Sequence, residues 1–113
     1  MENKTLSLLW AEALTSDDCD RYVAEWSTSS IWGNMEDLTD DDLLTAAVKL
    51  TQIWELAHMT VKEICKKANL SQSALADRFC IPRRTVEDWC RGLRTPPDYI
   101  RFMMALLLEL LNT

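Results

Sequence analysis

The chain has 113 residues, of which 48% are hydrophobic, and carries 12 Lys and Arg against 18 Asp and Glu. This length is typical of one domain, and the apolar fraction excludes an intrinsically disordered chain. Only 2 Gly and 3 Pro are present, too few for the turns of a β-sandwich or barrel, whereas 17 Leu and 10 Ala favour helix. We therefore predict an all-α fold of about seven helices.

The sequence gives no sign of export or membrane insertion. Residues 1–4 are not a basic segment with a long apolar run behind it, and the densest apolar run, 102–108, is far short of the roughly 20 residues that span a bilayer. The cysteines are too widely spaced for a C-x-x-C pair, which favours reduced thiols. They are Cys19, Cys65, Cys80 and Cys90. We expect a cytoplasmic protein without a membrane partner.

Charge is distributed unevenly along the chain. Residues 1–59 hold 3 basic and 12 acidic residues, a net of −9, whereas residues 60–104 hold 9 basic and 5 acidic residues, a net of +4. The acidic total of −6 argues against nucleic acid as a partner, but the split indicates that one part alone meets phosphate. We predict two regions: an acidic helical region over 1–59, packed on or dimerising with the rest, and a second domain over 60–113.

The acidic region is predicted to contain three helices. Apolar residues recur at helical spacing over 6–14 and over 19–26, and the second run follows cap signals at 15–17. A polar connection over 27–37 contains a predicted turn at Gly33-Asn34.

The third predicted helix begins after Thr39, which is expected to cap a first turn of three aspartates, and it ends near Ala57. We interpret the acidic run as a solvated helix start. The expected apolar stripe of this helix consists of Leu43, Ala47, Leu50, Trp54 and Ala57, widened by Leu44 and Val48.

Three short helices are predicted after residue 60. Thr60 and Glu63 have capping-box spacing, and the first helix is expected to end at Asn69. Ser71 is placed to cap the second helix. The third begins at or near Pro82, after a connection of about three residues, and ends at Gly92 with arginines on its polar face. Two short helices joined by a tight turn, the second displaying arginines, form an arrangement that fits the major groove of DNA.

This segment closely resembles the lambda-repressor-like family (Cro/C1, or Xre-type) of helix-turn-helix proteins, over residues of about 60–105. The positions in register with the family motif are Ser71, Gln72, Ala76, Trp89, Gly92 and Pro96. The resemblance implies a lambda-repressor-like domain with an additional N-terminal helical segment. The N-terminal half, with Ser29-Ser30-Ile31-Trp32-Gly33, is similar to uncharacterised helix-turn-helix proteins of mobile elements, which implies no function.

The resemblance also implies roles for individual residues. Gln72 would touch a phosphate or a base edge, and Arg83 and Arg84 would open the recognition helix and pair with guanine. Asp88 would face a base and accept from cytosine, and Thr85 would face the groove or the backbone.

Arg91 and Arg94 match the segment after the recognition helix, where the family contacts the DNA backbone. Contacts of this kind position the protein on the duplex without reading its sequence.

The sequence departs from the family pattern at its cysteines. Cys80 stands where the turn usually has glycine, which predicts either a strained left-handed residue or a turn altered by Pro82. Cys65 and Cys90 replace an Arg and a Glu that often pair in the family, so no charge is left unpaired. His58 with these cysteines lacks any standard zinc-ligand spacing. We expect no metal, no cofactor and no catalytic site.

The last predicted helix, over 99–111, has eleven apolar residues among its thirteen, with Arg101 and Glu109 as the exceptions. A helix that covers one core needs only one apolar stripe, so a second face is expected to pack on the N-terminal helices or on a second subunit. We expect Leu107 and Leu111 to face outward. The set expected to cover the core is Phe102, Met103, Leu106 and Leu110.

Two functional hypotheses follow. The favoured one is a sequence-specific regulator of transcription that binds double-stranded DNA, a repressor that recognises a palindromic operator as a homodimer. The alternative is a protein-interaction or DNA-mimic module, antitoxin-like or anti-defence, whose acidic half binds a protein partner. An enzyme is not expected. Loss of duplex binding on removal of Arg83 and Arg84 would support the first hypothesis, and a co-purifying partner would support the second.

Overall fold

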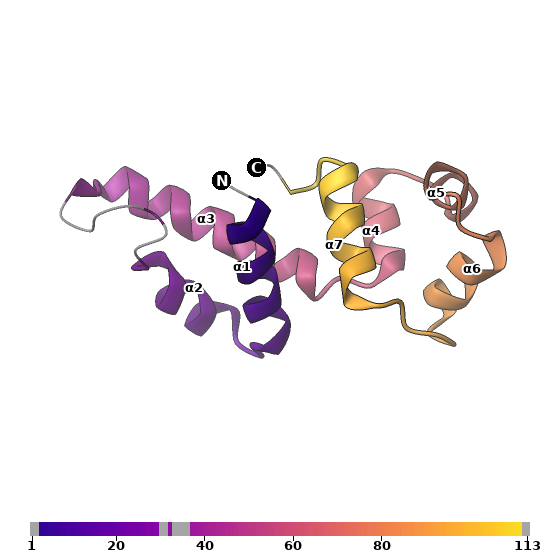
Figure 1. Cartoon of the computed structure of the whole chain (residues 1–113), viewed down its shortest axis with the longest axis horizontal. Helices are drawn as coiled ribbons and strands as arrows, with labels where there is room; N and C mark the ends of the chain where they lie inside the picture. Colours follow the sequence, from indigo (N-terminus) through magenta and orange to yellow (C-terminus); the bar gives the residue numbers. More distant parts are fainter. Residues whose placement is uncertain (1–2, 30–31, 33–36, 112–113) are drawn as a thin grey trace. The chain divides into compact units, whose positions relative to one another are not determined.

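The computed structural model describes residues 3–29, 32 and 37–111. Within these ranges the chain forms seven helices and no strand, which confirms the predicted all-α fold (Figure 1). The chain divides into two compact units, Met1–Ala57 and His58–Asn112, which we call the N-terminal unit and the C-terminal unit. The turn predicted at Gly33-Asn34 and part of the mobile-element similarity at 29–33 lie outside the described residues.

The N-terminal unit contains the three helices that the sequence predicts: α1 (Asn3–Thr15), α2 (Cys19–Ser27) and α3 (Asp40–Ala57). The long helix α3 packs against both α1 and α2. Two hydrogen bonds link these elements, from the Tyr22 hydroxyl to the Leu9 carbonyl at 2.8 Å and from the Trp54 indole to the Ser16 carbonyl at 3.1 Å. The buried apolar side chains of the three helices include Leu6, Leu9, Ala13, Tyr22, Leu50 and Ile53.

The ends of these helices follow capping rules, with one correction. Helix α2 is capped by Asp18, whose carboxylate accepts the Arg21 amide at 3.3 Å, so the cap lies beyond the predicted signals at 15–17. Thr39 caps α3 as predicted, because its hydroxyl accepts the Asp42 amide at 3.1 Å while its own amide donates to the Asp42 carboxylate at 3.0 Å. Both caps satisfy amides that have no partner within the helix, and the pair of Thr39 and Asp42 is reciprocal.

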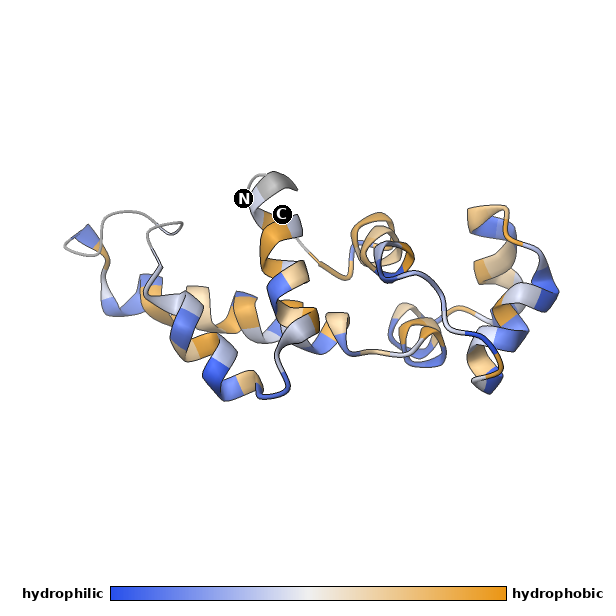
Figure 2. Cartoon of the chain, turned by 60° about the horizontal axis from the view of Figure 1, so that its bottom comes forward, coloured by the Kyte–Doolittle hydropathy of each residue, from blue (hydrophilic) through white to orange (hydrophobic). Residues whose placement is uncertain are grey.

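The predicted apolar stripe of α3 was too wide. Leu44 and Val48 are each 64% exposed, whereas Ala46 and Ile53 are buried. The buried face of the helix is therefore rotated away from Leu44 and Val48, because a helix that packs on one side buries only one stripe. Figure 2, coloured by hydropathy, shows that apolar and polar residues alternate along the helices.

The C-terminal unit contains four helices: α4 (Val61–Ala68), α5 (Gln72–Phe79), α6 (Arg83–Arg91) and α7 (Asp98–Leu107). Helices α4, α5 and α6 pack against one another. Side chains from all four helices form one hydrophobic core, with Phe79, Trp89, Cys90 and Ile100 packed at its edge. Its buried members are Val61, Ile64, Cys65, Leu75, Ala76, Val86 and Met104.

All four helices of this unit are followed by a residue in the left-handed conformation: Asn69, Cys80, Gly92 and Glu109. In each case the amide of the next residue donates to the carbonyl five residues back, at 2.9 Å. This bond satisfies a carbonyl that the helix leaves without a partner. Only one of the four positions is glycine, so the other three adopt a backbone conformation that side chains disfavour.

Helix α7 is shorter than the sequence predicts, because it ends at Leu107 rather than at Leu111. The predicted outward pair is therefore wrong in part: Leu107 is 57% exposed, but Leu111 lies beyond the helix and is only 2% exposed. The inward set is also corrected, since Met103 is exposed and Met104 is buried. Among the described residues, no helix has both the length and the apolar character needed to cross a bilayer.

Candidate nucleic-acid interface

Helices α5 and α6 form the helix-turn-helix element. Helix α5 begins at Gln72, directly after Ser71, whose hydroxyl accepts the Ala74 amide at 3.0 Å. Helix α6 begins at Arg83 after Pro82, which fixes the backbone before the first turn and supplies no side-chain cap. The two helices are in contact and are separated by residues 80–82 alone.

The turn between them is made by a left-handed cysteine. Cys80 has φ 54° and ψ 40°, so the first of the two predicted possibilities, a strained left-handed residue, is the one observed. The Ile81 amide donates to the Ala76 carbonyl at 2.9 Å and closes the turn. The geometry is that of the glycine turn with a side chain added, and the Cys80 side chain is exposed.

Three of the predicted site residues lie exposed at the starts of the two helices. Gln72 is the first residue of α5, and Arg83 and Arg84 are the first two residues of α6. Neither helix has an acidic residue in its first turn, in contrast to α3 with its three aspartates. The first turn of a helix carries partial positive charge, and the two arginines add to it, so the start of α6 is suited to an anionic partner.

The arginines of α6 are available for such a partner. Among the residues that the structure describes, Arg83, Arg84 and Arg91 take part in no ion pair. All three are exposed. Their guanidinium groups therefore have no internal carboxylate to give up before they bind a phosphate or a base edge.

Asp88 and Arg94 are joined to each other. The Arg94 Nε lies 3.6 Å from the Asp88 carboxylate, whose side chain is only 15% exposed, whereas that of Arg94 is 70% exposed. The Asp88 carbonyl also accepts the amides of Leu93 at 2.9 Å and Arg94 at 3.4 Å. In this structure Asp88 holds the segment after α6 in place, a different task from the base contact that the family resemblance implies for it. Thr85 is half-buried beside the exposed arginines.

Sequence reasoning did not predict the contacts of Arg101 at the start of α7. The Arg101 guanidinium donates to the Met59 carbonyl at 2.9 Å and to the Asp98 carboxylate at 3.0 Å. These contacts tie α7 to the segment that leads into α4. The signal was present in the sequence, because a single cation in an apolar segment requires a specific partner.

The cysteines and His58 do not gather into one site. Cys65 is buried in α4 and Cys90 is half-buried in α6, and their thiols share a hydrogen bond. Burial, together with Cys90, raises the pKa of the Cys65 thiol to about 11, and burial also raises the pKa of Cys90. Cys80 is exposed at the turn. No three His, Cys, Asp or Glu side chains among the described residues are grouped so that they could hold a metal ion.

Comparison with known families agrees with this geometry. Residues 61–102 match the helix-turn-helix family of the Cro/C1 type, which includes the Xre-like proteins. The match runs from the first residue of α4 into α7, so this part of the chain is a helix-turn-helix domain. A domain of this family indicates a DNA-binding regulator of transcription. No curated protein and no solved structure matches the chain, and the similarity of the N-terminal half to mobile-element proteins stays a prediction.

Proposed function

We propose that the chain is a sequence-specific regulator that binds double-stranded DNA in the cytoplasm and represses transcription by occupying a palindromic operator as a homodimer. The observation that carries the proposal is the pair of exposed arginines at the acid-free start of α6, the second helix of a helix-turn-helix domain. A helix of this length enters the major groove and presents its first residues to base edges. The proposed role is binding, with no catalytic step.

The proposed contacts separate into two kinds. Arg83 and Arg84 each carry a planar guanidinium that can donate two hydrogen bonds to O6 and N7 of guanine, which specifies a base. Gln72, Arg91 and Arg94 lie at the edges of the element and bind phosphate oxygens, which adds affinity for any sequence. Arg94 pairs with Asp88 through Nε and its side chain is 70% exposed, which leaves its other donors for a phosphate.

A selection from a random duplex library tests the proposal. The full chain should enrich a common half-site at low salt, and the variant Arg83→Ala/Arg84→Ala should lose that enrichment. Arg21→Ala is a suitable control, because Arg21 is an exposed arginine of the N-terminal unit and lies outside the proposed interface. Equal enrichment by the chain and by the double variant, or no enrichment by the chain, would exclude sequence-specific binding through α6.

The homodimer is proposed from the exposed face of α7. Tyr99, Met103 and Leu107 are exposed and lie at intervals of four residues, so they form one stripe along the helix. In two copies related by a two-fold axis, Tyr99 of one copy meets Leu107 of the other across the two Met103 side chains. A palindrome requires its two recognition helices to lie about 34 Å apart, on successive major-groove faces, and a two-fold dimer is the arrangement that presents them in this way.

Light scattering tests this interface. The chain should be a dimer at micromolar concentration, and Leu107→Glu should give a folded monomer that binds the operator more weakly because its two half-sites are no longer linked. Leu44→Glu is the matched control, since Leu44 is an exposed leucine of the N-terminal unit, outside both the stripe and the proposed DNA interface. A monomeric chain, or a Leu107→Glu variant that stays dimeric, would exclude the stripe of α7 as a dimer interface.

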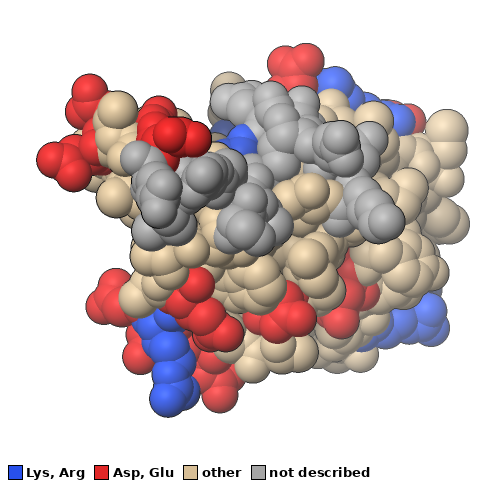
Figure 3. Space-filling model, turned by 60° about the vertical axis from the view of Figure 1, so that its left-hand side comes forward, with Lys and Arg blue, Asp and Glu red and all other residues tan. Residues whose placement is uncertain are grey.

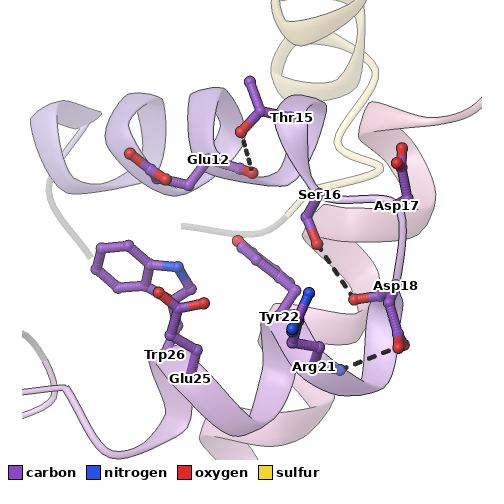
Figure 4. Close-up of a pocket in the computed structure, with 9 residues that line it drawn as sticks. All are labelled: Glu12, Thr15, Ser16, Asp17, Asp18, Arg21, Tyr22, Glu25 and Trp26. Carbon is purple, nitrogen blue, oxygen red and sulfur yellow. Dashed lines mark hydrogen bonds between the residues drawn. The ribbon is translucent and has the colours of Figure 1, made fainter.

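A second candidate function is the binding of a basic protein by the N-terminal unit. Figure 3 shows acidic side chains outnumbering basic ones on the face of the molecule that it presents. A hollow of about 290 Å³ at the α1–α2 turn favours this role, because it is lined by four carboxylates and one arginine (Figure 4). The charged residues of the hollow are Glu12, Asp17, Asp18, Arg21 and Glu25.

This candidate predicts a partner that depends on the hollow alone. A protein recovered with the chain should be lost on the change Glu12→Gln/Glu25→Gln and retained on Arg83→Ala/Arg84→Ala. Two other exposed acids, changed in Asp40→Asn/Asp41→Asn, give a control of the same net charge outside the hollow. A partner lost equally with both acidic changes would indicate attraction to overall charge, without a specific site.

A further inference from the structure

The contact between α4 and α6 contains two thiols that the proposed function does not use. Cys65 is a buried member of the hydrophobic core, and Cys90 packs at the edge of the same core in the last turn of α6. The helices α4 and α6 pack against each other at this point. The two side chains share a hydrogen bond, so their sulfur atoms are direct neighbours.

Other features of the unit make the pair distinct from the remaining cysteines. Cys80 is exposed at the α5–α6 turn, and Cys19 belongs to the N-terminal unit. Burial raises the pKa of both thiols, but at Cys90 the hydrogen bond from Cys65 and the Lys62 ammonium act in the opposite direction, so Cys90 ionises more readily than Cys65. The pair therefore has one thiol that ionises before the other, with the second thiol beside it.

We propose that Cys65 and Cys90 form a modification site at which a peroxide converts the two thiols into a disulfide between α4 and α6. The Cys90 thiolate attacks one peroxide oxygen, so that an S–O bond forms, the O–O bond breaks and the departing oxygen leaves as water after taking a proton. The Cys65 sulfur then attacks the Cys90 sulfenic acid, the S–S bond forms, the S–O bond breaks and the second oxygen leaves as water with the Cys65 proton. Two thiols are oxidised, and one peroxide is reduced to two waters.

The proposed bond would join two helices that already pack against each other. The sulfur atoms must approach from hydrogen-bond contact to a bond length of about 2.05 Å. Cys90 is the next-to-last residue of α6, directly before Arg91 and the left-handed Gly92, so the end of the helix can shift without moving Arg83 and Arg84. The bond closes a long loop from residue 65 to residue 90, and it should raise the melting temperature by roughly 10 °C or more.

Peptide mapping of the full chain tests the proposal. The chain is treated with hydrogen peroxide at mildly alkaline pH. Burial raises the pKa of both thiols, so a higher pH is needed to increase the thiolate fraction. Trypsin should then release peptide 63–66 joined to peptide 85–91 in the absence of a reductant. The oxidised chain should melt at a higher temperature than the reduced chain, and a reductant should reverse the shift.

Two variants separate this pair from the other thiols. Cys80→Ser should keep both the joined peptides and the shift in melting temperature, whereas Cys90→Ser should lose both. Cys90 is half-buried, so this change leaves the buried Cys65 in the core. The proposal is overturned if Cys65 and Cys90 stay reduced under peroxide that oxidises Cys80, if either is joined to Cys80 or Cys19 instead, or if the joined peptides appear without a rise in melting temperature. These readouts are independent of DNA binding.

Discussion

The two units use the same helical construction and opposite charge. The N-terminal unit has 3 basic and 12 acidic residues, whereas the C-terminal unit, His58–Asn112, has 9 basic and 6 acidic residues. Three aspartates occupy the first turn of α3, while the first turns of α5 and α6 have no acid and α6 begins with two arginines. Because the helices pack through their apolar stripes, the surface charge can differ between the units without changing how the helices pack. That charge then determines which kind of partner each unit can bind.

The largest expected effects come from the two buried cores. Leu75→Ala removes a fully buried leucine of the C-terminal core and should lower the free energy of unfolding by about 2–5 kcal/mol. Leu50→Ala is the matched change in the N-terminal unit, where Leu50 is also fully buried. Hydrogen exchange should show lost protection in α4–α7 for the first variant and in α1–α3 for the second. The same loss across both units in both variants would mean that they do not open separately.

A smaller effect should separate the roles of the arginines. Arg83→Ala should weaken binding to the selected operator by about 1–3 kcal/mol and relax the preference at one base position. Arg94→Ala should weaken binding to all duplexes alike, because its proposed contact is with phosphate. Binding titrations against single-base variants of the operator measure both effects. If neither change altered the base preference, the recognition helix would have to be placed elsewhere.

An effect of about 1 kcal/mol is expected at the α5–α6 turn. Cys80 has a left-handed backbone that costs energy for any residue with a Cβ atom, so Cys80→Gly should raise the free energy of unfolding of the C-terminal unit by about 1 kcal/mol. Cys80→Ser removes the thiol and keeps the Cβ atom, so it should give no gain. Denaturant titration of the three proteins distinguishes relief of backbone strain from loss of the thiol, and an equal gain for serine would exclude the strain.

The smallest effect should appear in the acidic unit as a dependence on pH. Hydrogen bonds from the Thr39 amide and hydroxyl lower the pKa of the Asp42 carboxyl. The folded state therefore favours the charged form of Asp42. The stability that this carboxylate contributes is present above its unfolded pKa and is lost as pH falls through its folded pKa. Asp42→Asn should be less stable than the parent chain at neutral pH, and the difference should vanish in acid.

Circular dichroism of thermal unfolding across this pH range measures that difference. Asp41→Asn is the control, because it removes a carboxylate from the same turn but leaves the reciprocal pair of Thr39 and Asp42 intact. A difference between the Asp42→Asn variant and the parent chain that persists in acid would show that the cap acts without its charge.

Local chemistry explains what could be predicted from the sequence. Thr60, Ser71 and Gly92 mark helix ends through contacts within a few residues, and the structure places all three as predicted. The exposure of Leu44 depends on which stripe of α3 meets α1 and α2, and a wide apolar face does not encode that choice. The early end of α7 at Leu107 depends on a left-handed glutamate, which residue preferences disfavour.

In the candidate site, too, some features follow from the local sequence and others depend on contacts that the sequence does not reveal. The exposed positions of Arg83 and Arg84 follow from their place at the start of a short helix with an apolar opposite face. The ion pair of Asp88 with Arg94 joins two residues six positions apart through the turn at Gly92. Spacing along the sequence does not reveal such a contact, and the family resemblance implies a different role for Asp88.

The central claim is that the basic C-terminal unit binds duplex DNA by neutralising phosphates, although the whole chain is acidic. The most direct measurement is the affinity of the full chain for a selected operator, or for mixed-sequence duplex if none is selected, as a function of salt concentration. A dimer that makes about six to ten phosphate contacts should lose roughly 10³- to 10⁵-fold in affinity between about 50 and 200 mM salt. No measurable duplex binding at low salt, or an affinity that salt leaves unchanged, would contradict the account.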